Sequence, residues 1–141
     1  MTSPVTSPVI SLDPLLLDTQ LLLWWAAQPE RLPPLLLKTL EDPERPVLFS
    51  VVSLWEVAIK TSLGRSDFQV DGAALRHGLL TQGFIELPIK AEHALGVQQL
   101  PWIHRDPFDR LLVAVAQVEG LTLLTTEESL AGYGQGIRTV P

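Results

Sequence analysis

The stretch H-R-D-P-F-D-R-L-L-V-A-V-A-Q-V-E-G-L-T-L-L, residues His104 to Leu124, has a polar start, an apolar middle and a second apolar run after a glycine. The D-P pair at positions 106–107 is typical of an N-cap and a first helical residue, and Gly120 is typical of a helix end. We therefore predict a helix over 107–119. The short apolar run Leu121–Leu124 follows directly and predicts a buried strand.

The same alternation of helical stretches and short apolar runs extends outward to both ends of the chain. Further strands are expected at Leu15–Leu17, Val47–Phe49, Phe84–Leu87 and Ile137–Val140. Further helices are expected at Thr19–Ala27, Pro34–Glu41, Val51–Leu63, Ala73–Leu80, Ala91–Gln99 and Glu127–Ala131. Continuously apolar strands that alternate with helices indicate a central parallel sheet covered by helices on both faces, which is the α/β class.

The composition indicates one folded domain. The 141 residues are 46% hydrophobic and 18% charged, which provides enough apolar surface for a single core. We expect residues 1–13 to be a flexible leader and residues 14–141 to form the domain. The chain has no cysteine, and its apolar run Leu15–Ala27 is broken by polar residues and too short to cross a bilayer. These features predict a cytoplasmic protein without a membrane segment.

Acidic residues follow three of the predicted strands and also lie on one helix that is apolar nearly all round. They are Asp18, Glu56, Asp106, Asp109 and Glu127. Because ligand sites of parallel sheets gather at the carboxyl ends of the strands, we expect several of these acids to meet at one edge. The formal charge of −6 argues against a broad basic surface that binds nucleic acid. Any nucleic-acid role would therefore need a local source of positive charge, such as a metal ion.

The first two acids have structural alternatives. Asp18 can cap the helix that begins at Thr19 by accepting a hydrogen bond from a free backbone amide. Glu56 can pair with Lys60, which stands four residues further along the same helix. A carboxylate on a largely buried helix is costly unless it is paired or bound to a metal, so pairing and a functional role are compatible.

The remaining acids also fit helix caps. Asp106 and Asp109 match a capping box in which the second acid reaches back to the first. Thr125 with Glu128 matches the T-x-x-E capping pattern, which leaves Glu127 free to point elsewhere. Asp109 is harder to explain as a cap alone, because the rest of its helix belongs in the core.

Clustered carboxylates repel one another unless a cation shares them, and an oxygen-rich site of this kind suits Mg²⁺ or Mn²⁺. No phosphate-binding glycine loop, nucleophile elbow or H-E-x-x-H motif competes with this interpretation. The histidines are scattered, and we expect each to be a surface or internally bonded side chain: His77, His93 and His104.

Four strings occur in order along the chain: L-L-L-D-T-Q-L-L-L-W-W, S-V-V-S-L-W-E-V-A-I-K, L-P-W-I-H-R-D-P-F-D-R-L-L-V-A-V-A and G-L-T-L-L-T-T-E-E-S-L-A-G-Y-G. In this order they resemble the PIN-domain family, and specifically the VapC-like ribonuclease toxins of toxin-antitoxin pairs. The resemblance covers the chain from Leu15 to the C-terminus. It implies a Mg²⁺-dependent endoribonuclease with an acidic site at the carboxyl edge of a parallel sheet.

The resemblance also implies roles for individual residues. Asp18, Glu56 and Asp109 match the family's first three acids and are the expected catalytic and metal-binding residues. At the fourth position this chain has Glu127 where the family usually has aspartate, and Asp106 is a further expected member of the metal site. Residues expected to orient the acids are Thr19, Ser53 and Thr125. Expected phosphate contacts are Arg105, Arg110, Lys60 and Arg65, with surface salt bridges as the alternative.

The mechanism implied is hydrolysis of RNA assisted by Mg²⁺, with Mn²⁺ as a substitute. A VapB-like antitoxin and a second copy of the chain are the implied partners. Exposed tryptophans are candidates for the partner surface, with core packing as the alternative: Trp24, Trp25 and Trp55. Two other functions stay open on the residues alone, namely a metal-dependent phosphatase acting on small phosphate esters and a non-catalytic module whose acids only cap helices.

Overall fold

Five parallel strands form one sheet in the computed structural model, which describes residues 13–140. The strand order is β3-β2-β1-β4-β5, so β1 lies in the centre of the sheet. The strands are β1 (Leu15–Leu17), β2 (Val47–Ser50), β3 (Ile85–Leu87), β4 (Thr122–Thr125) and β5 (Ile137–Thr139). The predicted α/β class is confirmed. Of the predicted leader, residues 1–13, only Asp13 falls within the described residues.

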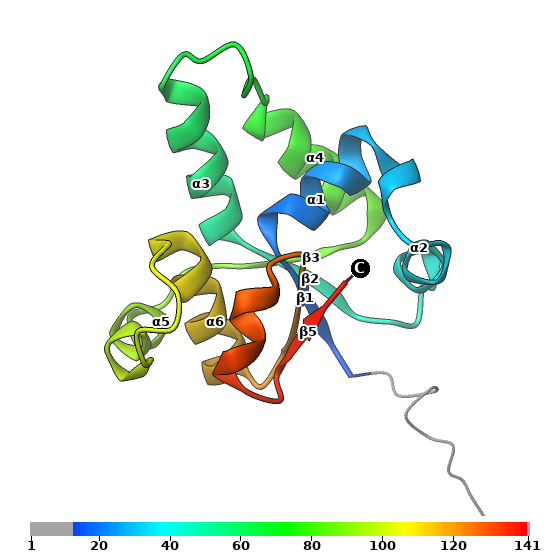
Figure 1. Ribbon diagram of the computed structural model, residues 1–141. Coiled ribbons are helices and arrows are strands. Elements are labelled where there is room, and N and C mark those ends of the chain that lie inside the picture. Colours follow the sequence, from blue (N-terminus) through cyan, green and yellow to red (C-terminus); the bar gives the residue numbers. More distant parts are fainter. Residues whose placement is uncertain (1–12, 141) are drawn as a thin grey trace, which may run out of the picture.

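Helices cover both faces of the sheet, as Figure 1 shows. The α-helices are α1 (Thr19–Ala27), α2 (Pro34–Glu41), α3 (Val51–Ser62), α4 (Gly72–Gln82), α5 (Ala91–Gly96) and α6 (Pro107–Glu119). Helices α1, α2 and α4 pack on one face, while α6 packs on the other and carries α5 against it. None of the helices in residues 13–140 has the length and apolar character needed to span a membrane.

Both faces of each central strand are buried, which explains why these strands are continuously apolar. Leu15 and Leu17 of β1 belong to the core under α1, α2 and α4, whereas Leu16 between them belongs to the core under α6. In β4, Leu124 and Leu123 divide between the two cores in the same way. Successive side chains of a strand point to opposite faces, so an unbroken apolar run is what a sheet covered on both faces requires.

Side-chain caps begin three helices next to the carboxyl ends of the strands. Asp18 accepts a hydrogen bond from a backbone amide of α1, Ser50 caps α3 at the end of β2, and Asp106 caps α6. Gly120 ends α6 with a φ of 69°, the left-handed conformation that glycine adopts without steric cost. Three of the connections that surround the sheet edge are therefore fixed by local chemistry that the sequence displays.

The predicted cap at Thr125 and Glu128 is wrong. The Thr125 hydroxyl donates to Asp18 at 2.7 Å and accepts from the Glu127 amide at 3.0 Å, so it begins no α-helix. A capping threonine would accept from the Glu128 amide, whereas Thr125 accepts from Glu127 and gives its proton to the buried Asp18 carboxylate, a strong charged acceptor. The segment that follows is a 3₁₀ helix, Glu128–Tyr133.

Candidate metal centre

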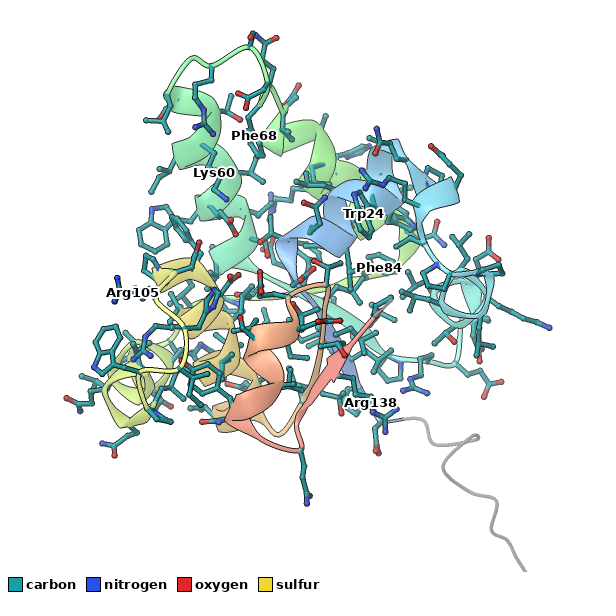
Figure 2. All side chains as sticks on the ribbon, viewed as in Figure 1. Trp24, Lys60, Phe68, Phe84, Arg105 and Arg138 are labelled. Carbon is teal, nitrogen blue, oxygen red and sulfur yellow. The ribbon has the colours of Figure 1, made fainter. Side chains whose placement is uncertain are left out.

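Five carboxylates and one ammonium line a single cavity of about 240 Å³ beside the carboxyl ends of β1 and β4. The sequence prediction that the acids meet at one sheet edge is therefore confirmed. Three elements and one loop supply them: the end of β1, helix α3, the first turn of α6 and the turn after β4. The lining acids are Asp18, Glu56, Asp106, Asp109 and Glu127. Lys60, which extends from α3 and is labelled in Figure 2, lines the same cavity.

Asp18 is a helix cap and a cavity-lining residue at once. Its Oδ1 accepts from the Leu21 amide at 2.8 Å, which is the capping bond of α1. Its Oδ2 accepts from the Thr125 hydroxyl at 2.7 Å and from the Thr126 amide at 3.0 Å. Burial raises the pKa of Asp18, and the hydrogen bond from Thr125 opposes that shift most strongly. The two interpretations of Asp18 are thus compatible, because each concerns a different carboxylate oxygen.

Glu56 has a polar contact at each of its carboxylate oxygens. Its Oε1 accepts from the Thr19 hydroxyl at 2.6 Å, and its Oε2 lies 2.5 Å from Lys60 Nζ. Ser53 Oγ lies 2.9 Å from Thr19 Oγ1. A hydroxyl has one proton, so when Thr19 donates to Glu56 the Ser53 hydroxyl donates to Thr19. Thr19 and Ser53 therefore form a short chain that orients the buried carboxylate.

Asp109 lies at the end of a second polar chain, which sequence analysis missed. Its Oδ2 is 2.9 Å from His104 Nε2, and His104 Nδ1 is 2.9 Å from Ser129 Oγ. Ser129 Oγ in turn donates to Glu127 Oε1 at 3.0 Å. His104 therefore links the acid of α6 to the acid that follows β4. The available signal was its place in the H-R-D-P-F-D string, five residues before Asp109.

Asp106 caps α6 through one oxygen only. Its Oδ1 accepts from the amides of Phe108 and Asp109, at 2.8 and 3.0 Å. The predicted capping box is wrong in its second half, because the Asp109 carboxylate turns to His104 instead of reaching back to the cap. Burial, and then the charge of Asp106, raises the pKa of Asp109 to about 6.

The predicted phosphate contact at Arg110 is wrong. Its side chain is buried, and its guanidinium donates to backbone carbonyls of the loop before α6 and to the Tyr133 hydroxyl. The Trp102 ring covers it at 3.9 Å. Arg110 is therefore an internal brace of the loop. Arg105 is exposed and does not line the cavity, and Arg65 lies 3.5 Å from the Asp67 carboxylate (Figure 2 labels Arg105).

The donor set fits a hard divalent cation, because carboxylate oxygens are the ligands that Mg²⁺ and Mn²⁺ prefer. Asp109 Oδ1 and Asp106 Oδ2 accept no hydrogen bond from residues 13–140 and are free to face an ion. In their present positions, however, no three acidic or histidine side chains of the described chain form a group that could hold one.

Mn²⁺ binding is expected to weaken about tenfold between pH 7.5 and pH 5. Asp109, with a pKa of about 6, is a carboxylate above that pH and holds a proton below it, so protons compete with the ion as the pH falls. Titration of the protein with Mn²⁺ by electron paramagnetic resonance at both pH values measures the change. Equal affinity at the two values would contradict this role of Asp109.

Solved structures with the same fold include several toxin-antitoxin complexes. A chain of VapBC2 from Rickettsia felis, bound to a promoter DNA fragment, aligns with a TM-score of 0.69 at 14% identity, over 91% of this chain and 99% of that one. A chain of DNA-bound VapBC from Salmonella typhimurium aligns with a TM-score of 0.62 at 18% identity, over 89% of this chain and 95% of that one. A chain of a toxin-antitoxin complex from Klebsiella pneumoniae aligns with a TM-score of 0.57 at 21% identity, over 89% of this chain and 96% of that one.

Comparison with curated proteins gives no match. A family model described as PIN domain matches residues 15–134, which run from the first residue of β1 to just past the 3₁₀ helix that follows β4. This span contains all five acids of the cavity and the whole sheet except its edge strand β5. The chain therefore belongs to the PIN domain family.

Proposed function

We propose that this protein is a Mg²⁺-dependent endoribonuclease toxin, silenced by a cognate antitoxin. The observation that carries the proposal is the cavity in which Asp18, Glu56 and Asp109 converge from three separate elements of a PIN domain. Acids brought together in this way are costly unless they share a cation, since each raises the cost of ionising its neighbours. The burial of Asp18 and Asp109 adds to that cost.

Asp18, Glu56 and Asp109 would hold the ion, and Asp106 and Glu127 would complete its surroundings directly or through water. Bound Mg²⁺, or Mn²⁺ in its place, supplies a Lewis acid that activates a water molecule and neutralises charge on the phosphate. Thr125 and Thr19 keep their carboxylates in fixed orientations, and His104 does the same for Asp109. An ion in this cavity also supplies the local positive charge that a chain of net charge −6 lacks.

An antitoxin partner is supported by the similarity of this fold to chains of toxin-antitoxin complexes. A groove of about 650 Å³ between α1 and the loop before α4 suits an apolar partner segment, and Trp24 and Phe68 line it (Figure 2). Trp25 is less suitable, because it packs on Phe84 with ring centroids 5.1 Å apart. Trp55 lies on α3 and is 48% exposed, which suits a contact with a second copy in the proposed homodimer.

RNA cleavage by the purified protein tests the proposal. With Mg²⁺ we expect structured RNA to be cut, and we expect EDTA to stop the reaction and added Mn²⁺ to restore it. Hydrolysis of a small aryl phosphate under the same conditions should be at background level. Cleavage that survives EDTA would contradict the metal-dependent mechanism, whereas phosphatase activity without RNA cleavage would support the rival enzyme class. No Mn²⁺ binding at all would support a non-catalytic module.

A further inference from the structure

Lys60 is the one basic side chain that lines the acidic cavity within residues 13–140. Its ammonium lies 2.5 Å from Glu56 Oε2, one turn of α3 away. The Lys60 side chain is 36% exposed and that of Glu56 is 8% exposed, so the cation reaches inward from the mouth of the cavity to a carboxylate at its wall. Lys60 is therefore positioned between solvent and the acids.

The ammonium contacts a carboxylate of the proposed metal site. Thr19 donates to Oε1 of Glu56, whereas Oε2 has Lys60 as its hydrogen-bond partner within residues 13–140. Ammonium and Mg²⁺ carry charge of the same sign and repel each other at short range. Lys60 and a divalent ion would therefore compete for the same carboxylate of Glu56.

We propose that Lys60 is the internal counter-ion of the metal-free site, which holds Glu56 until a divalent ion replaces it and then turns to a phosphate of the RNA. The inference rests on the proposed function, because it concerns the ion and the substrate assigned to the same cavity. A partly exposed ion pair four residues apart on a helix is weak, so a dication that several carboxylates share can displace it. The long, flexible lysine stem allows the released ammonium to stay at the cavity mouth.

The test is Mn²⁺ affinity, measured by electron paramagnetic resonance on the full chain without RNA. Lys60→Met is expected to tighten Mn²⁺ binding about five- to tenfold, because the competing charge is removed, whereas Lys60→Arg keeps the charge and should change it less than twofold. Lys90→Met is the matched control. It also removes a lysine from an ion pair, with Glu119 at 3.1 Å, but outside the cavity, and should leave the affinity within twofold.

A Glu56→Gln background separates the specific pair from the general effect of charge. Glutamine cannot form the ion pair, so only the general repulsion between the ammonium and Mn²⁺ remains, and the gain from Lys60→Met should fall to about twofold in that background. The same five- to tenfold gain in both backgrounds, or no gain in the native background, would overturn the proposal. If the native protein binds no Mn²⁺, the proposed function itself fails, which is a different result from binding that ignores Lys60.

The same substitution, Lys60→Met, is expected to weaken RNA binding although it strengthens Mn²⁺ binding. At saturating Mn²⁺, Lys60→Met should raise the KM for RNA at least threefold with little change in kcat, because a phosphate contact is lost. Tighter metal binding together with a higher KM is not expected from simple damage to the fold. An unchanged KM would overturn the phosphate contact.

Discussion

RNA cleavage is expected to fall at least 100-fold when Asp109 is replaced by asparagine, while the apo protein becomes more stable. Asparagine keeps the shape of the side chain and can still accept from His104, but it cannot carry the charge that a metal ion requires. Burial, and then the charge of Asp106, raises the pKa of Asp109 from its usual value of 3.8 to about 6. The free energy of unfolding therefore falls as the pH rises from 3.8 through 6, because ionisation costs more in the folded than in the unfolded chain. Removing that charge should raise the melting temperature in EDTA at pH 7.5 by about 3 °C.

Calorimetry and an RNA cleavage assay on the same preparations measure the two effects. Asp42→Asn is the matched control, since Asp42 is an exposed aspartate outside the cavity whose carboxylate accepts from a backbone amide. It should leave both the cleavage rate and the melting temperature close to those of the native protein. Loss of cleavage with a lower melting temperature would indicate general damage to the fold and would contradict this account of Asp109.

Replacement of Arg110 by leucine is expected to lower the free energy of unfolding by about 3–5 kcal/mol. Arg110 is 3% exposed and its guanidinium donates to several carbonyls of the loop before α6, so leucine would leave those acceptors without donors. It would also remove the group that the exposed Trp102 ring covers. No carboxylate is among these partners, so the loss is one of hydrogen bonds and packing instead of ion pairing.

Urea denaturation of the Arg110 variants measures this cost. Arg110→Lys should recover less than half of it, because a lysine cannot donate to all of the acceptors that the planar guanidinium reaches. Arg138→Leu, at an exposed arginine of β5, should change the free energy of unfolding by less than about 0.5 kcal/mol. A cost for Arg110→Leu no larger than that of Arg138→Leu would show that the brace contributes nothing to stability.

The sheet and the helix starts could be predicted because their causes are local. Three leucines followed by Asp18 show both a strand buried on two faces and the cap of the next helix. The same locality explains why Asp106 and Pro107 indicate the start of α6. The convergence of the acids also followed, since the carboxyl ends of parallel strands share one edge.

The contacts of His104 and Arg110 could not be predicted in this way. Both depend on the path of the loop before α6, and that path is held by hydrogen bonds to carbonyls and to Tyr133, more than twenty residues away along the chain. The sequence displays the charge of Arg110 but not its burial, so a surface role was the natural prediction. Local spacing likewise assigned Thr125 to the nearest helix, and only the family resemblance assigned it to the acids; its carboxylate partner lies 107 positions earlier.

The central position of β1 has a consequence for protein synthesis. Its neighbour β4 begins more than 100 residues later, and the register pairs Leu15 with Thr122. Because a ribosome releases the chain from the N-terminus, β1 leaves the exit tunnel long before its partner strand exists. Oδ2 of Asp18 gains its hydrogen bonds from Thr125 and Thr126 only after β4 has emerged. A nascent chain that stops before Thr126 therefore lacks an assembled acidic centre, and the proposed metal site forms only after β4 has been synthesised.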